Sequence, residues 1–128
     1  MGERREIDLG DILTVVTDKM FSPHGLAGLG AFLQFLVGEE VYNHQFRRVM
    51  LGECRPWLLA WHPQLREVDA HLVEPATAQM WLAEQIQRFG KTLVVEQIPP
   101  ELHERIDPES ELVEQGLKFG VILQNLKS

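Results

Sequence analysis

The stretch HQFRRVMLGECRPWLLAWHP, residues 44–63, decides how the middle of this chain folds, and it contains the only cysteine, Cys54. A helix advances about 100° per residue, and on such a helix the large apolar side chains of the stretch fall on one arc. The pattern predicts an amphipathic helix that begins after Glu40 and ends at Trp61, because Pro63 stops it.

Pro56 interrupts this predicted helix. A proline inside a helix removes one hydrogen bond and clashes with the carbonyl of the fourth residue before it, here Gly52. We therefore expect a kink, or two abutting helices, near Cys54 and Arg55. We call the expected kink the seam. Glu53 lies at the seam on the same side of the helix as the apolar arc, and a buried carboxylate either finds a partner or shifts its pKa. The favoured interpretation of Glu53 is a structural ion pair, with a perturbed functional acid as the alternative.

Cys54 lies inside the apolar arc, which predicts a thiol buried in the core, because unpaired cysteine is among the most buried residue types. Along a straight helix His44 and His62 are about 27 Å apart, too far to share a metal ion. Cys54 and His62 are about 12 Å apart along the axis, too far for a thiol nucleophile and its base. We predict no catalytic residue, no metal site and no cofactor, and hence no enzyme. A small thiol enzyme that uses Cys54 with Glu53 or His62 at a Pro56 kink is the alternative.

The polar face of the same helix carries the only concentration of positive charge in a protein whose net charge is −7. We call this face the basic ridge, and its residues are His44, Arg47, Arg48, Arg55 and His62. Three interpretations remain open: the solvated side of an amphipathic helix, pairing with the protein's own acidic residues 96–114, and docking on an acidic patch of a partner.

Acidic side chains concentrate in residues 96–114, the acidic segment, which holds seven acids and one base. Such a balance argues against direct binding to a phosphate backbone, which needs clustered Lys and Arg. An acidic surface instead suits a basic nucleic-acid channel on a partner protein. The predicted interaction residues of this segment are Glu101, Glu104, Asp107, Glu109 and Glu111.

The remaining histidines and the clustered glycines do not indicate a site. His71 and His103 stand alone in polar surroundings, and no other functional group converges on them. Gly25, Gly28 and Gly30 match neither the phosphate-loop nor the dinucleotide pattern. We expect these glycines to permit close packing, and we expect His24, His71 and His103 to have no catalytic role.

The first forty residues predict a short strand and two helices. Residues 11–20 are ambiguous between strand and helix, and the favoured interpretation is a strand near residues 7–9 followed by a helix from Ile12. Ser22 and Pro23 suit the start of the next helix, and Gly38 suits its end. The apolar stripe of that helix is Leu26, Leu29, Leu33 and Leu36.

The second half predicts a helix over residues 75–89, ended by Gly90, and a strand over residues 91–98. The inward residues of the helix are Ala78, Leu82, Ile86 and Phe89. Asp107 and Pro108 suit the start of another short helix.

These elements predict an α+β fold, a single helix-rich domain over residues 1–128 with a small β-sheet or hairpin. Residues 1–6 are expected to form a flexible leader, and residues 116–128 a last strand or a docking tail. No apolar run approaches the roughly 20 residues of a membrane span, and no signal peptide is evident. We expect a cytoplasmic protein without a membrane partner, which the single cysteine also fits.

The runs TDKMFSP and LVGEEVYNHQFRRVMLGECRPWLLAWHPQL, residues 17–23 and 36–65, resemble a group of small proteins encoded in bacteriophage and prophage genomes. The group's pattern is Thr-His-Gln, Arg, Glu-Cys-x-Pro-Trp-Leu-Leu and His-Pro-x-Leu, and Asn43 departs from the threonine. The likeness covers residues 8–65, and more loosely residues 100–113. It implies a phage context and no particular chemistry. The matching residues are His44, Gln45, Arg48, Glu53, Cys54, Pro56, Trp57, Leu58, Leu59, His62, Pro63, Gln64 and Leu65.

Together these features predict a phage or prophage accessory protein that acts by stoichiometric protein–protein binding in the cytoplasm of the bacterial host. Inhibition of a bacterial defence complex, such as a CRISPR surveillance complex, is one concrete version. The alternatives are the thiol enzyme and a component of virion assembly.

Overall fold

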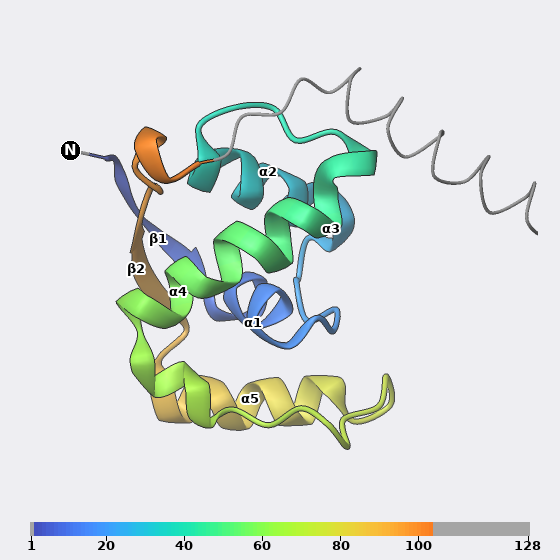
Figure 1. The fold of residues 1–128 in the computed structure, drawn as a ribbon. Coiled ribbons are helices and arrows are strands. Elements are labelled where there is room, and N and C mark those ends of the chain that lie inside the picture. The colour runs from blue at the N-terminus through green and yellow to red at the C-terminus, as the bar shows by residue number, and fades with distance from the viewer. Residues whose placement is uncertain (1, 104–128) are drawn as a thin grey trace, which may run out of the picture.

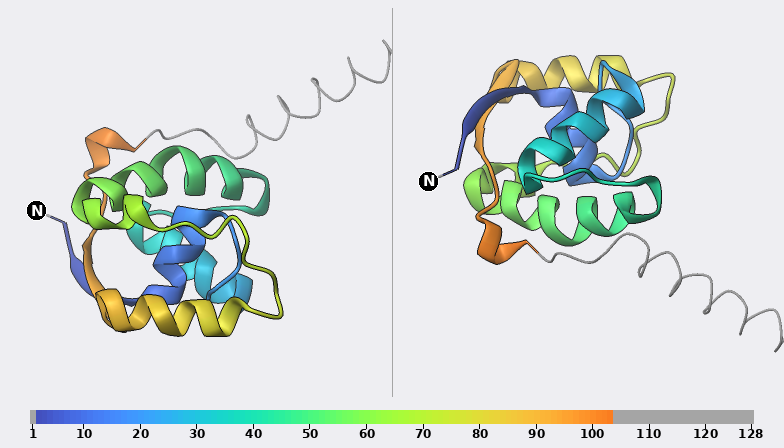
Figure 2. Two further views of the ribbon diagram at one scale, coloured as in Figure 1. Left: turned by 90° about the horizontal axis from the view of Figure 1, so that it is seen from below. Right: turned by 90° about the horizontal axis from the view of Figure 1, so that it is seen from above.

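Helix α1 (Leu9–Thr17) lies at the centre of the fold in the computed structural model, which describes residues 2–103. Figure 2 shows α1 enclosed by the other helices and by the sheet. Its side chains are buried on every face, and Leu9, Ile12, Leu13 and Val15 are fully buried. Asp11 and Thr14 are buried as well, and each forms a side-chain hydrogen bond. Burial on all sides of the helix outweighs the strand preference of its Thr and Val residues. Segment 11–20 is therefore mainly helical.

Strand β1 (Arg4–Asp8) pairs antiparallel with β2 (Thr92–Glu96), with Arg4 opposite Glu96 and Asp8 opposite Thr92. Residues 4–6 therefore belong to the sheet and are not a flexible leader. The strand lies earlier than expected, and α1 begins at Leu9 instead of Ile12, because the buried apolar run starts there. The strand expected over residues 91–98 is confirmed, and the α+β fold class is confirmed with it.

Helix α2 (Gly25–Val37) ends as predicted at Gly38, which adopts φ 75° and donates its N–H to the Gln34 carbonyl. The helix begins three residues after Ser22, because Ser22 and Pro23 form the preceding turn. Three of the four striped leucines are buried, whereas Leu26 in the first turn is exposed. The core faces only the later turns of α2, so the prediction for Leu26 was wrong.

The central stretch forms one continuous rod (Figure 1). A 3-10 turn (Asn43–Gln45) leads into α3 (Phe46–Val49), a π turn (Met50–Cys54) follows, and α4 (Arg55–Trp61) completes the rod. The Arg55 N–H donates to the Met50 carbonyl, five residues back. The predicted seam lies at this widened turn, because Pro56 follows it with no N–H to donate.

Helix α5 (Ala78–Phe89) begins three residues later than predicted and ends at Gly90 as predicted. Its four predicted inward residues are partly buried and pack against the core. A 3-10 turn (Pro63–Glu67) and a loop connect α4 to α5, and a 3-10 turn (Pro100–Leu102) follows β2.

A side chain of the rod, Trp57, and one that directly follows the rod, His62, cover one edge of β2. The Trp57 Nε1–H donates to the Glu96 carbonyl at 2.7 Å, and His62 Nε2 lies 2.8 Å from the Val94 carbonyl. Alternate carbonyls of a strand point to the same edge. The rod therefore occupies the edge of β2 that faces away from β1.

The predicted helix at Asp107, the predicted tail at 116–128, and Glu104, Asp107, Glu109 and Glu111 of the acidic segment lie outside the described residues. Within residues 2–103, no helix combines the length and the hydropathy of a membrane span.

Candidate functional site

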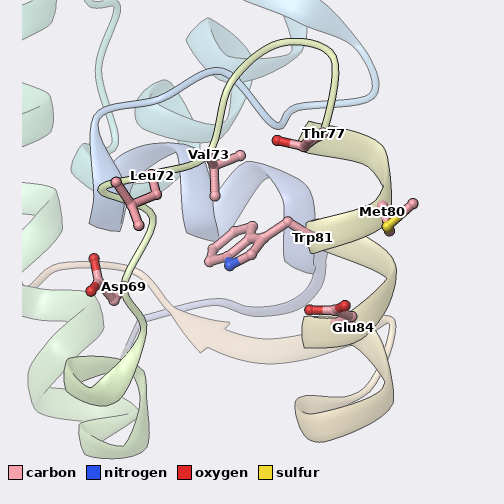
Figure 3. A pocket seen from close by; sticks show the side chains of 7 residues that line it. All are labelled: Asp69, Leu72, Val73, Thr77, Met80, Trp81 and Glu84. Atoms are coloured by element: carbon pink, nitrogen blue, oxygen red, sulfur yellow. The ribbon is translucent and has the colours of Figure 1, made fainter.

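An open apolar groove lies between α5 and the loop of residues 69–77, and we call it the α5 groove (Figure 3). We include under this name a neighbouring pocket between the loop and residues 19–21. The two pockets have volumes of about 310 Å³ and 390 Å³ and share Val73. The first is lined by Asp69, Leu72, Val73, Thr77, Met80, Trp81 and Glu84. The second is lined by Lys19, Met20, Phe21, Val73, Glu74, Pro75 and Ala78.

Contacts to the segment that follows α1 hold the loop of the groove in place. Lys19 Nζ donates to the carbonyls of Ala70, His71 and Val73 at 2.5, 3.2 and 2.9 Å. Three carbonyls of one short loop thus converge on a single ammonium group. On the other wall Trp81 stacks on Phe21, with ring centroids 4.7 Å apart. The shape of the groove is therefore set by tertiary contacts.

The apolar side chains around the α5 groove are unusually exposed. Leu72 is 87% exposed, Met80 70% and Met20 49%. Single exposed apolar residues are ordinary on a protein surface, but apolar residues grouped at a concave site mark places where a partner binds. Figure 3 shows Trp81 extending from α5 towards Leu72 and Val73 of the loop. The groove therefore offers a large aromatic ring and flexible aliphatic side chains to a ligand.

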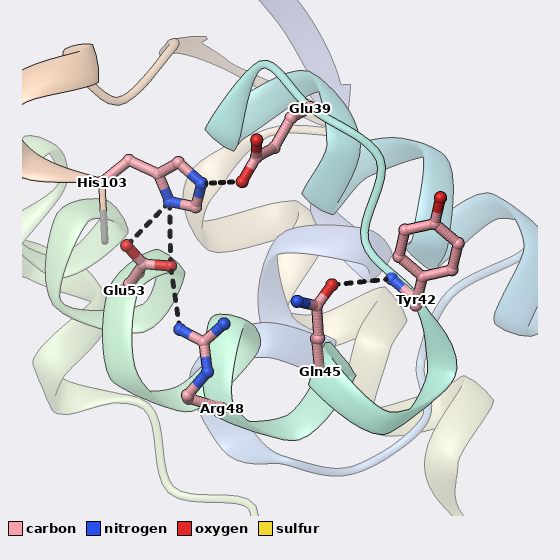
Figure 4. A network of polar contacts seen from close by, with 6 residues as sticks. All are labelled: Glu39, Tyr42, Gln45, Arg48, Glu53 and His103. Atoms are coloured by element: carbon pink, nitrogen blue, oxygen red, sulfur yellow. Dashed lines mark hydrogen bonds and ion pairs between the residues drawn. The ribbon is translucent and has the colours of Figure 1, made fainter. Parts of the chain in front are cut away.

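A second cluster joins His103 to the rod and to the segment after α2 (Figure 4). His103 Nδ1 lies 2.8 and 3.1 Å from the two Glu53 oxygens, and Nε2 lies 2.5 Å from Glu39 Oε1. Arg48 lies 3.9 Å from Glu53. The His103 side chain is only 2% exposed. Because two carboxylates contact its ring, the expectation that no functional group converges on His103 was wrong. Its partners stand 50 and 64 residues away in the chain, and no local pattern reveals them.

This cluster fastens the 3-10 turn after β2 onto the rod. Glu53 lies at the seam on the side of the apolar arc, as predicted. It pairs with His103, which agrees with the favoured interpretation of a structural ion pair. Both nitrogens of His103 are engaged by carboxylates, which leaves neither nitrogen for a metal ion. Within residues 2–103, no group of three His, Cys, Asp or Glu side chains is arranged to hold a metal.

The basic ridge does not form one surface. Arg47 pairs with Asp18 at 2.8 Å, and Arg55 Nε donates to the Val15 carbonyl at 3.2 Å. Arg48 turns towards Glu53, while His62 bonds to β2. The His44 ring stacks on Tyr42, with centroids 6.2 Å apart.

The expectation of a continuous ridge was wrong because the rod is not a regular α-helix. A π turn holds about one more residue than an α turn, which rotates the residues after it by about 100°. Of the described acidic segment, Glu96 pairs with Arg4 at 3.2 Å and Glu101 is exposed.

Cys54 is fully buried, as the apolar arc predicted. Burial raises the pKa of its thiol, and the Glu53 carboxylate beside it raises that pKa further. The reactive form of a cysteine is the thiolate, which this environment disfavours. The position of Cys54 therefore argues against its use as a nucleophile.

Sequence reasoning missed the α5 groove. Leu72 lies in a loop, and Met80 lies outside the apolar stripe of α5, so neither belongs to a periodic pattern. The one available signal was Met80, a large apolar residue on the face of the helix where the helical pattern expects a polar one.

The similarity of this chain to known proteins lies in its first half. No curated protein and no solved structure matches. One family model matches the part of the chain from the end of β1 to the 3-10 turn after α4, so α5, β2 and most of the α5 groove lie outside the match. Residues 7–68 match the model of a family described as a domain of unknown function, DUF7736.

Proposed function

We propose that this protein acts by stoichiometric binding of a protein partner, and that the α5 groove is the docking surface. The observation that carries the proposal is the exposure of Leu72 and Met80 beside Trp81 at a concave site. Aromatic and methionine side chains are enriched in protein interfaces, and a few such anchors supply most of the binding energy. Burying one such side chain contributes about 1.5–3 kcal/mol.

The partner is proposed from the phage context that the resemblance implies. A phage accessory protein in the cytoplasm of the bacterial host would bind a host or phage complex, and a bacterial defence complex such as a CRISPR surveillance complex is our first candidate. The buried Cys54 gives the thiol-enzyme alternative no support. A virion assembly component remains the competing binding role.

The test is capture of partners from the bacterial host with the full chain, followed by affinity measurement with the purified partner. The double variant Leu72→Ser/Met80→Ser should weaken binding at least about 100-fold, because it removes two apolar anchors. The matched control is Leu26→Ser/Leu102→Ser, which removes two exposed leucines outside the groove. Equal affinities of the two double variants would exclude the groove as the docking surface.

The identity of the partner then separates the biological roles. If the partner is a defence complex, the protein should restore plasmid establishment in a host that carries that defence, and the groove variant should not. Recovery of the protein in purified virions, bound to a structural component, would favour assembly instead.

A further inference from the structure

The rim of the α5 groove carries carboxylates that have no cationic partner in the described part of the chain. Asp69 and Glu84 line the first pocket, and Glu74 lines the second. None of the three forms an ion pair within residues 2–103, whereas the nearby Glu67 pairs with Arg88 at 3.6 Å. Figure 3 shows Asp69 on the loop and Glu84 on α5, with the Trp81 indole between them. The negative charge of the rim thus remains available to a ligand.

The single cation among the described lining residues does not neutralise this rim. Lys19 Nζ is engaged by the three loop carbonyls. Those bonds hold its ammonium group against the backbone of the loop. A ligand in the groove therefore meets apolar surface and three carboxylates, which outnumber the one ammonium group among the lining residues.

Trp81 adds a second feature that suits a cation. One face of its ring packs on Phe21, and the ring borders the open pocket. Lys and Arg side chains bind favourably over an indole ring, and their aliphatic stems pack on apolar surface. Leu72 and Met80 beside the ring suit the apolar residues of the same ligand.

We propose that the α5 groove recognises a positively charged amphipathic segment of its partner, with apolar side chains seated on Trp81, Leu72 and Met80 and with Lys or Arg side chains at Asp69 and Glu84. This proposal rests on the proposed function, whose docking surface it uses. Charge complementarity favours such a segment over a second copy of this acidic chain or an anionic membrane surface. The partner is thereby specified by its chemistry.

The experiment uses three synthetic 14-residue helical peptides with the same leucine pattern and with Lys, Gln or Glu at all other positions. Each is titrated into the full-length isotope-labelled protein, and backbone amide shifts locate the binding site. We expect the Leu-Lys peptide to shift the resonances of α5 and the 69–77 loop. The Leu-Gln peptide should bind there about tenfold more weakly, and the Leu-Glu peptide should not bind.

The rim variant Asp69→Asn/Glu84→Gln should weaken binding of the Leu-Lys peptide about tenfold, since two exposed charge pairs are removed. The control Glu6→Gln/Glu101→Gln makes the same change in net charge away from the groove and should retain affinity. A rise in salt from 50 to 500 mM should reproduce the loss, because it screens exposed charges.

Three results would overturn the proposal: equal affinities of the three peptides, equal effects of the rim and control variants, or shifts confined to another surface. Self-association of the full chain that Leu72→Ser/Met80→Ser abolishes would assign the groove to a second copy. These failures are distinct from failure of the proposed function, because the serine variant tests the apolar docking surface and the Asn/Gln variant tests only the charge of the ligand.

Discussion

His103 shows how a single residue acquires its role from distant parts of the chain. A neutral imidazole has one N–H and one lone pair, so two hydrogen bonds to two carboxylates require two protons shared among the three groups. Arg48 places a further positive charge beside Glu53. The Glu53 side chain is only 11% exposed, so loss of its partner leaves a carboxylate with little access to water.

Replacement of His103 is therefore expected to destabilise the fold. His103→Gln should lower the free energy of unfolding by about 2–3 kcal/mol, because a buried charged group loses a hydrogen-bonding partner. Urea denaturation measures the change, and the exposed His71→Gln variant should differ from the parent by less than about 0.5 kcal/mol. If the loss of unfolding free energy for His103→Gln were no larger than that for His71→Gln, the contacts of His103 with Glu53 and Glu39 would not stabilise the fold.

For single residues, the sequence predicted those features that depend on local periodicity. The burial of Cys54 follows from its place on the apolar arc, and it is confirmed. The environment of His103 depends on two residues far away in the chain, so no local pattern carries it.

The rod shows how one proline shapes a whole element. The π turn at Met50–Cys54 widens the helix before Pro56, where a regular turn would place the proline ring against the Gly52 carbonyl. The sequence therefore located the seam correctly, but the widened turn keeps α3 and α4 continuous. The same turn separates the side chains that a regular helix would have aligned as the basic ridge.

A proline should consequently be tolerated at position 56 and not one turn later. Pro56→Ala should change the free energy of unfolding by less than about 1 kcal/mol, because the turn already accommodates the missing N–H. Ala60→Pro, at an exposed position inside α4, should lower it by about 3 kcal/mol. Thermal denaturation followed by circular dichroism compares them, and similar losses at both positions would refute this account of the turn.

The whole molecule is organised around α1, which contacts the sheet, α2, the rod and the turn that follows it. Gly10 shows how closely these parts approach. A Cβ atom at Gly10 would lie 2.5 Å from the Phe21 carbonyl oxygen, whereas one at Gly52 would meet nothing within 4 Å. The central helix therefore tolerates little added volume, while the outside of the rod has room for it.

Two glycine variants test this organisation. Gly10→Ala should lower the free energy of unfolding by about 1–3 kcal/mol, because the added methyl group forces the backbone near Phe21 to move. Gly52→Ala should raise it by up to about 1 kcal/mol, because alanine has less conformational freedom to lose in the unfolded chain. Urea denaturation of both variants measures these changes, and a neutral Gly10→Ala would show that α1 is packed less tightly than described.

The sequence by itself determined the α+β class, the approximate places of its helices and of β2, the helix-ending role of Gly38 and Gly90, and the burial of Cys54. These features depend on side-chain periodicity and backbone preferences within about ten residues. Only the tertiary structure decided the pairing of β1, the partners of His103 and the α5 groove. Each of them joins segments tens of residues apart, and their contacts arise only once those segments pack around α1.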